Sequence, residues 1–133
     1  MGAWGTGSFE NDAALDWVYA FRDSSGTAQL TQTLQTALDD TDYLDLDDAS
    51  AAVATAEVVA ALKGVPAPDL PDEVQAWVAN EPTTPDPALI DLALRAIDRV
   101  LGPDSELKEI WEESDLANRW QGGINNLKRR LRA

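Results

Sequence analysis

The sequence predicts an all-α fold, a compact single domain over residues 1–133 built from about five main helices and one or two short ones. Apolar residues recur at helical spacing through most of the chain, and no segment shows the apolar–polar alternation of a half-buried strand. Residues that cap or break helices (Asn, Asp, Gly, Pro) fall at the ends of these periodic segments. With 133 residues, 44% of them hydrophobic, and no visible linker or repeat, the chain suits one core that buries about two-thirds of its unfolded surface.

Two helices are predicted before residue 40. Asn11 suits an N-cap position, and the residues after it form one apolar stripe: Ala14, Trp17, Val18 and Phe21. The Ser-Ser-Gly stretch at 24–26 ends this helix. The second helix then presents a face made of Leu30, Leu34, Ala37 and Leu38.

A third helix over residues 48–63 is expected at the centre of the fold. Asp47 or Asp48 would cap its start, and Gly64 would end it in the C′ position. The segment is apolar on nearly every side, which is typical of a helix surrounded by others.

The second half of the chain predicts four further helical segments. A short helix over 72–79 lies between proline-rich loops, and Asp86 with Pro87 opens a helix that runs to Leu101. Its outward face is predicted to be a solvated charge ladder of Asp91, Arg95, Asp98 and Arg99. Asp104 is expected to start a short helix and Ser114 the last one. That last helix should continue through Gly122-Gly123, because its apolar residues keep helical spacing: Trp120, Ile124, Leu127 and Leu131.

Composition narrows the possible functions. Because the chain has no Cys and no His, disulfides, thiolate zinc sites, Cys nucleophiles and His-dependent triads are excluded. The net charge of −14 disfavours binding to nucleic acid or to anionic lipid, and the five bases from Arg119 onward are too few to reverse it. The absence of a membrane-spanning apolar run and of a signal segment predicts a cytoplasmic protein, and the Ala and Arg bias favours a bacterial source.

The N-terminal stretch MGAWGTGSF predicts a segment that folds back onto the core. Gly2, Gly5 and Gly7 would allow tight, partly left-handed turns, and Trp4 and Phe9 would then be buried as anchors. The stretch lacks the glycine spacing and the preceding strand of a phosphate-binding loop, and we treat its match to the loose myristoylation pattern as coincidental.

Carboxylates supply the candidate site residues. The stretch DDTDYLDLDD holds six aspartates, and Asp40, Asp42, Asp45 and Asp47 could bind a cation or a basic partner. Because the spacing of a calcium-binding EF-hand is absent, we expect a solvated acidic loop and no metal.

Glu57 stands among Ala and Val residues, so we expect it to be at least half buried. It would then bind the N-terminal glycine-rich segment or an Arg. The alternative is a catalytic or ligand-binding carboxylate in a cleft.

Three stretches together resemble a known bacterial family. The opening MGAWGTGSFENDAALDW, the segment AEVVAALKG and the closing W…INNLKRRL are similar to the family named domain of unknown function 4259, over essentially the whole chain. The departure is Gly122-Gly123, which makes a poorer helix than the family pattern. The resemblance implies the family's fold and no catalytic residue. The matching positions are Gly2, Trp4, Gly5, Phe9, Asn11, Asp12, Asp16, Trp17, Glu57 and Gly64.

We therefore expect a non-enzymatic protein, with no cofactor, that binds a basic surface of a protein partner as small inhibitor or immunity proteins do. The basic end, LKRRLRA, is expected to complement its own helix dipole or the acidic body rather than nucleic acid. The alternative is a small hydrolase, carboxylate- or metal-dependent, that uses Glu57 and nearby Asp residues; a third possibility is a structural oligomer. The chain is expected to be a monomer or a homodimer.

Overall fold

The computed structural model describes residues 3, 5–40 and 42–133 and confirms the all-α class. The described residues form seven helices, two of them shorter than ten residues, where about five main helices and one or two short ones were expected. They are α1 (Asp12–Phe21), α2 (Ala28–Asp39), α3 (Leu46–Leu62), α4 (Asp72–Asn80), α5 (Pro87–Leu101), α6 (Glu106–Glu112) and α7 (Ala117–Arg132). None of these helices is long and apolar enough to cross a membrane.

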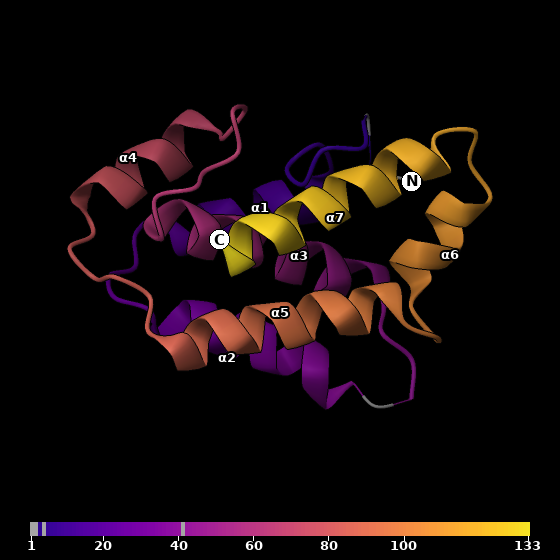
Figure 1. Cartoon of the computed structure of the whole chain (residues 1–133), viewed down its shortest axis with the longest axis horizontal. Coiled ribbons are helices and arrows are strands. Elements are labelled where there is room, and N and C mark those ends of the chain that lie inside the picture. Colours follow the sequence, from indigo (N-terminus) through magenta and orange to yellow (C-terminus); the bar gives the residue numbers. More distant parts are fainter. Residues whose placement is uncertain (1–2, 4, 41) are drawn as a thin grey trace.

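Helix α3 is the centre of the fold, as its composition predicts. It packs against all six other helices, and its residues from Ala52 to Ala61 are all buried. In Figure 1, α7 crosses in front of α3, α5 and α2 lie below it, and α4 and α6 stand at opposite ends. Because most of its side chains are small, several helices approach its axis together.

Both ends of α3 are capped by local interactions, but its start differs from the prediction. The N-cap is Asp45 rather than Asp47 or Asp48, and its carboxylate accepts a hydrogen bond from Asp48 N at 2.8 Å. At the other end Gly64 has φ of +96°, the left-handed conformation expected of C′, and the following N–H of Val65 bonds back to Ala60 O.

The predicted starts of the last two helices are wrong by a few residues. Asp104 has φ of +58°, which an N-cap residue does not adopt, so α6 starts after Ser105. Ser114 lies before the first turn of α7, where its hydroxyl accepts a hydrogen bond from Leu116 N. Helix α7 does run unbroken through Gly122-Gly123, as expected.

The outward face of α5 is only partly the solvated ladder that was predicted. Asp91 and Arg95 form an exposed pair with Arg95 Nε 2.9 Å from Asp91 Oδ2. Asp98, however, binds Lys128 of α7 at 2.7 Å, and Arg99 donates to the backbone carbonyls of Asp40, Pro103 and Asp104. This half of the face therefore anchors other segments.

The N-terminal segment folds back as predicted, but for a different reason at its glycines. Phe9 is buried, and Ala3 pairs with Asn11 in an antiparallel bridge. Gly7 does not adopt the left-handed conformation. The Glu10 carboxylate instead folds over Gly5 and Gly7: a Cβ on Gly5 would stand 2.5 Å from it, and Gly7 N donates to it at 3.0 Å. The predicted roles of Gly2 and Trp4 fall outside the described residues.

Candidate functional site

Two acidic segments that are far apart in the sequence meet at one corner of the molecule. The loop after α2 pairs with the segment before α6 through a parallel bridge between Leu44 and Ser105. Leu44 N donates to Asp104 O at 2.8 Å, and Glu106 N donates to Leu44 O at 2.9 Å. We name the described residues of 39–48 and 104–109 the acidic corner.

The acids of this corner lack ion-pair partners among the described residues. The carboxylates concerned are Asp39, Asp40, Asp42, Asp45, Asp47, Asp48, Asp104, Glu106 and Glu109. Arg99 gives its donors to backbone carbonyls, and Lys108 pairs with Glu112 beyond the corner at 3.5 Å. The corner therefore has a large excess of negative charge, with nine carboxylates against the cations of Arg99 and Lys108.

An aromatic side chain stands in this negative area. Tyr43 is 47% exposed, and its hydroxyl lies 3.4 Å from Glu109 Oε1. Partial desolvation, followed by the nearby carboxylates of Glu109, Glu106 and Asp104, raises the pKa of Tyr43 above its usual value. Tyr43 is therefore an exposed aromatic side chain with three carboxylates close to it.

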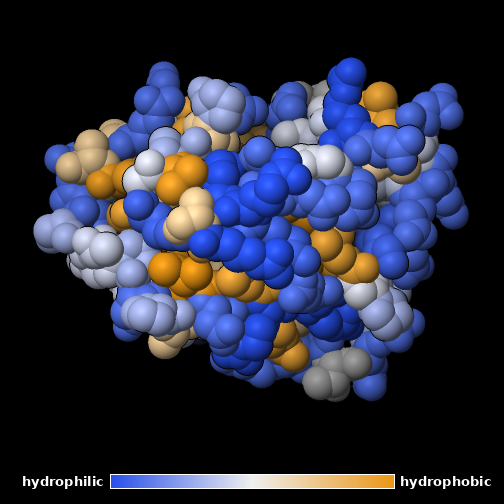
Figure 2. Space-filling view, viewed as in Figure 1, coloured by the Kyte–Doolittle hydropathy of each residue, from blue (hydrophilic) through white to orange (hydrophobic). Residues whose placement is uncertain are grey.

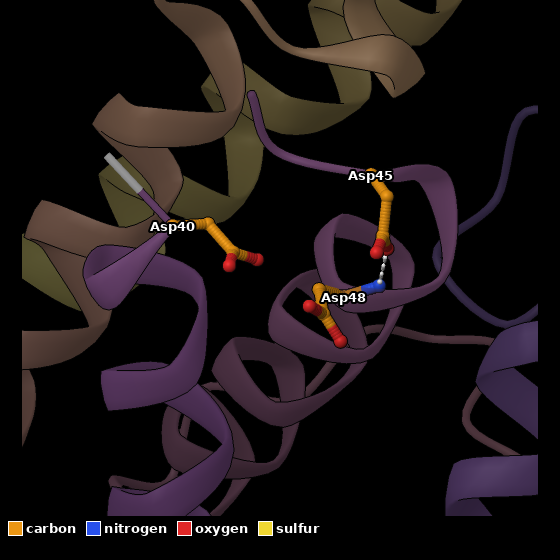
Figure 3. Close-up of side chains that lie close together, drawn as sticks. All are labelled: Asp40, Asp45 and Asp48. Carbon is orange, nitrogen blue, oxygen red and sulfur yellow. Dashed lines mark hydrogen bonds between the residues drawn. The ribbon is translucent and has the colours of Figure 1, made fainter. Parts of the chain in front are cut away.

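Three of the corner's carboxylates converge at the start of α3. Asp40, Asp45 and Asp48 each place an oxygen within 4.8 Å of the others (Figure 3). A hydrogen bond with the Asp40 carboxyl, then partial burial and the neighbouring carboxylates, raise the pKa of Asp48 to about 6. The group has three carboxylates, whereas Ca²⁺ takes about six to eight oxygen ligands.

The predicted loop residues divide between this group and solvent. Asp40 and Asp45 belong to the group, whereas Asp42 and Asp47 are exposed and lie outside it. Asp48, which the sequence suggested only as a helix cap, takes part. The sequence feature that could have predicted this is the position of Asp48 three residues after the true N-cap Asp45. This spacing brings the two carboxylates to the first turn of α3.

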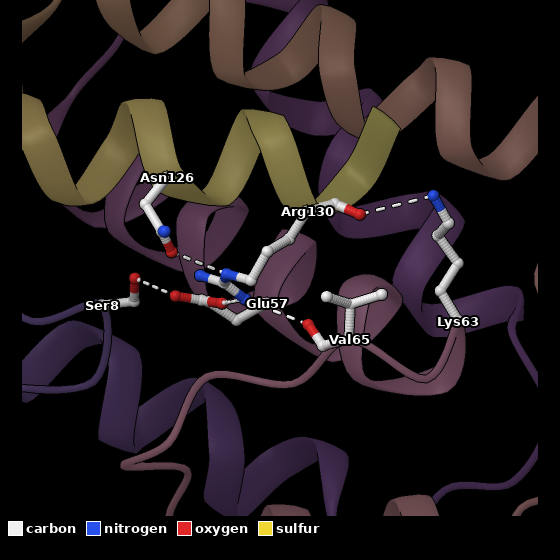
Figure 4. A network of polar contacts seen from close by, with 6 residues as sticks. All are labelled: Ser8, Glu57, Lys63, Val65, Asn126 and Arg130. Carbon is white, nitrogen blue, oxygen red and sulfur yellow. Dashed lines mark hydrogen bonds and ion pairs between the residues drawn. The ribbon is translucent and has the colours of Figure 1, made fainter. Parts of the chain in front are cut away.

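Glu57, in the middle of α3, belongs to a buried network of polar contacts that includes Ser8 and Arg130 (Figure 4). The whole Glu57 residue is 4% exposed, which confirms the expected burial. Ser8 Oγ donates to its Oε2 at 2.7 Å, and Arg130 Nη1 lies 2.8 Å from its Oε1. The carboxylate thus binds both groups that the sequence offered as alternatives, the glycine-rich N-terminal segment and an Arg.

The Arg130 guanidinium is itself held in place. Its Nε donates to Asn126 Oδ1 at 2.7 Å and its Nη1 to Val65 O at 3.3 Å. Nearby, Lys63 donates to the carbonyls of Arg130, Leu131 and Ala133 at the last turn of α7. The sequence predicted an Arg partner for Glu57 without identifying Arg130. The available signal was the position of Arg130 beside the buried stripe that contains Leu127 and Leu131.

Glu57 and the aspartate group do not form one site. Glu57 follows Asp48 by nine residues on the same helix, which separates them by about 13 Å along the axis at 1.5 Å per residue. The geometry therefore brings Glu57 to a cation of the protein itself, and leaves the aspartates at the surface.

Four other residues that the sequence singled out lie on α1 or at its start. Asn11 caps α1 by accepting from Ala14 N at 2.8 Å, and Trp17 is buried with its ring stacked on Phe21. Asp12 and Asp16 are exposed on α1.

Comparison with known proteins identifies the family. The sequence model of a family described as a domain of unknown function, DUF4259, matches residues 2–123. Neither the curated proteins nor the solved structures yield a match. Because the family match spans well over half of the chain, the chain belongs to DUF4259.

Proposed function

We propose that this member of the DUF4259 family is a non-enzymatic interaction module whose acidic corner binds a basic surface on a protein partner. The mode of action would be that of a small inhibitor or immunity protein, and the proposed setting is the bacterial cytoplasm. The observation that carries the proposal is the bridge between Leu44 and Ser105, which joins two acidic segments into one surface.

Charge supports a basic partner. The chain has a net charge of −14, and the corner's carboxylates have no ion-pair partners in the described part of the chain. A negative area of this kind accelerates encounter with a positive surface and repels nucleic acid. Since the carboxylates belong to two joined segments, the partner would meet a fixed arrangement rather than a loose acidic tail.

Side-chain chemistry supports a contact surface rather than a solvated loop alone. Tyr43 offers an exposed aromatic ring at the corner, and tyrosine is among the residues enriched at binding hot spots. Figure 2 shows a face on which hydrophilic residues predominate and hydrophobic residues reach the surface in separate patches. On that face, no single broad apolar area competes with charge as a basis for recognition.

The second candidate is a metal-dependent hydrolase, and the observation that favours it is the convergence of Asp40, Asp45 and Asp48. Glu57, the acid or base proposed for that chemistry, is instead held between Ser8 and Arg130. The interaction module is the better supported proposal, because it depends only on residues of the acidic corner. The hydrolase would need Glu57, which is already bound to Ser8 and Arg130.

The experiment is affinity capture from a bacterial lysate, with the whole chain as bait, at increasing salt. The corner variant carries Asp42→Asn, Asp104→Asn and Glu109→Gln, all at exposed positions. The control variant has the same change of charge at exposed positions elsewhere, Asp16→Asn, Asp23→Asn and Asp69→Asn.

We expect a basic protein that wild type and control variant retain, that the corner variant loses, and whose retention falls with salt. Equal capture by both variants would refute the corner as the binding surface. A saturable metal-dependent hydrolysis that Asp40→Asn abolishes would favour the second candidate.

A further inference from the structure

A cavity of about 240 Å³ lies between the N-terminal segment and helices α3, α6 and α7. Its apolar lining includes Val53 of α3, Leu107 and Trp111 of α6, and Trp120 and Ile124 of α7. Backbone and small side chains of residues 5–8 form another part of the wall. The cavity adjoins the acidic corner, because Leu46 and Asp47 line it too.

The size of the cavity restricts its occupant. An apolar cavity of about 150 Å³ holds one benzene molecule, and drug-sized ligands and cofactors occupy about 300–1,000 Å³. At about 240 Å³ this cavity has room for one long side chain and is small for a nucleotide or a flavin.

The charge of the lining selects the sign of that side chain. Asp12 of α1 and Asp47 of α3 line the cavity, and no Lys or Arg does so among the described lining residues. Both aspartates lie in the first turn of their helices, where each dipole contributes about half a positive charge. Because the two full negative charges outweigh the two half charges of the helix dipoles, the cavity lining favours a cation.

The aromatic lining distinguishes between cations. Trp111 and Trp120 supply indole surface, on which a planar guanidinium stacks better than the compact ammonium of lysine. A guanidinium also matches a carboxylate with two parallel hydrogen bonds.

We propose that the cavity receives a single arginine side chain from the basic partner, with its guanidinium between the indoles and the carboxylates of Asp12 and Asp47. The proposal rests on the proposed function, since it names the residue with which the partner anchors itself beside the acidic corner.

The test uses the whole chain and small probes, with no partner protein. N-acetyl-arginine amide is titrated while the indole N–H signals of Trp111 and Trp120 are followed by NMR. N-acetyl-citrulline amide, which has nearly the same shape without the charge, is the matched probe. The variant Asp12→Asn/Asp47→Asn is compared with Asp16→Asn/Asp23→Asn, which makes the same change of charge at exposed positions outside both the cavity lining and the acidic corner.

We expect a saturable shift of both indole signals by the arginine probe, with binding about tenfold weaker for the citrulline probe and for the Asp12/Asp47 variant. The Asp16/Asp23 variant should bind as wild type does. The inference is overturned if neither signal shifts, if citrulline binds equally well, or if both variants lose binding alike. If this test fails, the capture experiment still tests the acidic corner separately, because the corner variant retains both Asp12 and Asp47.

Discussion

Arg130 Nη1 lies 2.8 Å from Glu57 Oε1, and both side chains are largely withdrawn from water, with exposures of 13% and 6%. The pair joins the last turns of α7 to the middle of α3, and Ser8 adds the N-terminal segment to the same carboxylate. One buried acid therefore connects three parts of the chain.

Replacing Glu57 should destabilise the protein through the charge it strands. Glu57→Ala leaves Arg130 buried without its counter-ion, which costs about 3–5 kcal/mol in the free energy of unfolding. Glu57→Gln should cost less, because the amide still accepts from Ser8. In Glu57→Leu/Arg130→Met, which removes both charges, much of the loss should be recovered.

Denaturant unfolding of these variants measures the effect, with Asp91→Ala at the exposed pair with Arg95 as control, where we expect less than about 1 kcal/mol. The structural role of Glu57 would be contradicted by a Glu57→Gln protein that is as stable as wild type but no longer binds the captured protein.

Removing residues 1–9 should lower the free energy of unfolding by several kcal/mol. The segment contributes the buried ring of Phe9 and the hydroxyl of Ser8 that binds Glu57. Phe9→Ala alone should cost about 3–5 kcal/mol, whereas Tyr19→Ala, at a ring that is 55% exposed, should cost less than about 1 kcal/mol. If the truncated chain melts within a degree or two of wild type, the segment does not stabilise the core.

Alanine at Gly122 and Gly123 should stabilise α7. Both residues lie in the helix interior with open space where a Cβ would stand. Each replacement removes backbone freedom from the unfolded chain and should add about 0.5–1 kcal/mol. Gly64→Ala, at a φ of +96° that an L side chain rarely adopts, is the opposing control and should destabilise. A loss of stability at both α7 positions would indicate that another molecule approaches that surface.

The aspartates at the start of α3 should make stability depend on pH. The pKa of Asp48 is raised from its ordinary value of 3.8 to about 6, chiefly by the Asp40 carboxyl, so the folded protein holds this proton more tightly than the unfolded chain. The contribution of Asp48 therefore favours folding at low pH and is lost as the pH rises from about 4 to about 6.

Asp48→Asn should consequently be more stable than wild type at neutral pH, by about 1 kcal/mol once screening by solvent is counted, and equal to it in acid. Thermal unfolding across the pH range tests this. A variant less stable than wild type at neutral pH would indicate that the ionised Asp48 carboxylate is needed for folding.

Local patterns predicted most of the fold, and contacts between distant segments account for what they missed. The extent of α5, the buried stripe of α1 and the left-handed Gly64 depend on neighbours within a few residues. The start of α6 depends instead on a distant segment, because pairing of Ser105 with Leu44 fixes the backbone there.

The candidate site was harder to predict for the same reason. The acidic loop was visible in the sequence, but its union with residues 104–109 arises only in the folded chain. The choice of Arg130 among the closing bases depends on how α7 crosses α3. Asp48 entered the aspartate group because the chain turns back between α2 and α3 and brings Asp40 to it.

The rate of association with the captured partner distinguishes binding at the acidic corner from a response to overall charge. Stopped-flow measurement at several ionic strengths would compare wild type, the corner variant (Asp42→Asn, Asp104→Asn, Glu109→Gln) and the control variant (Asp16→Asn, Asp23→Asn, Asp69→Asn). If the acidic corner binds a basic surface, the corner variant should associate about tenfold more slowly at low salt and lose much of its salt dependence, while the control variant follows wild type. Equal rates and equal salt dependence for the two variants would contradict the account, because the partner would then respond to overall charge and not to the corner.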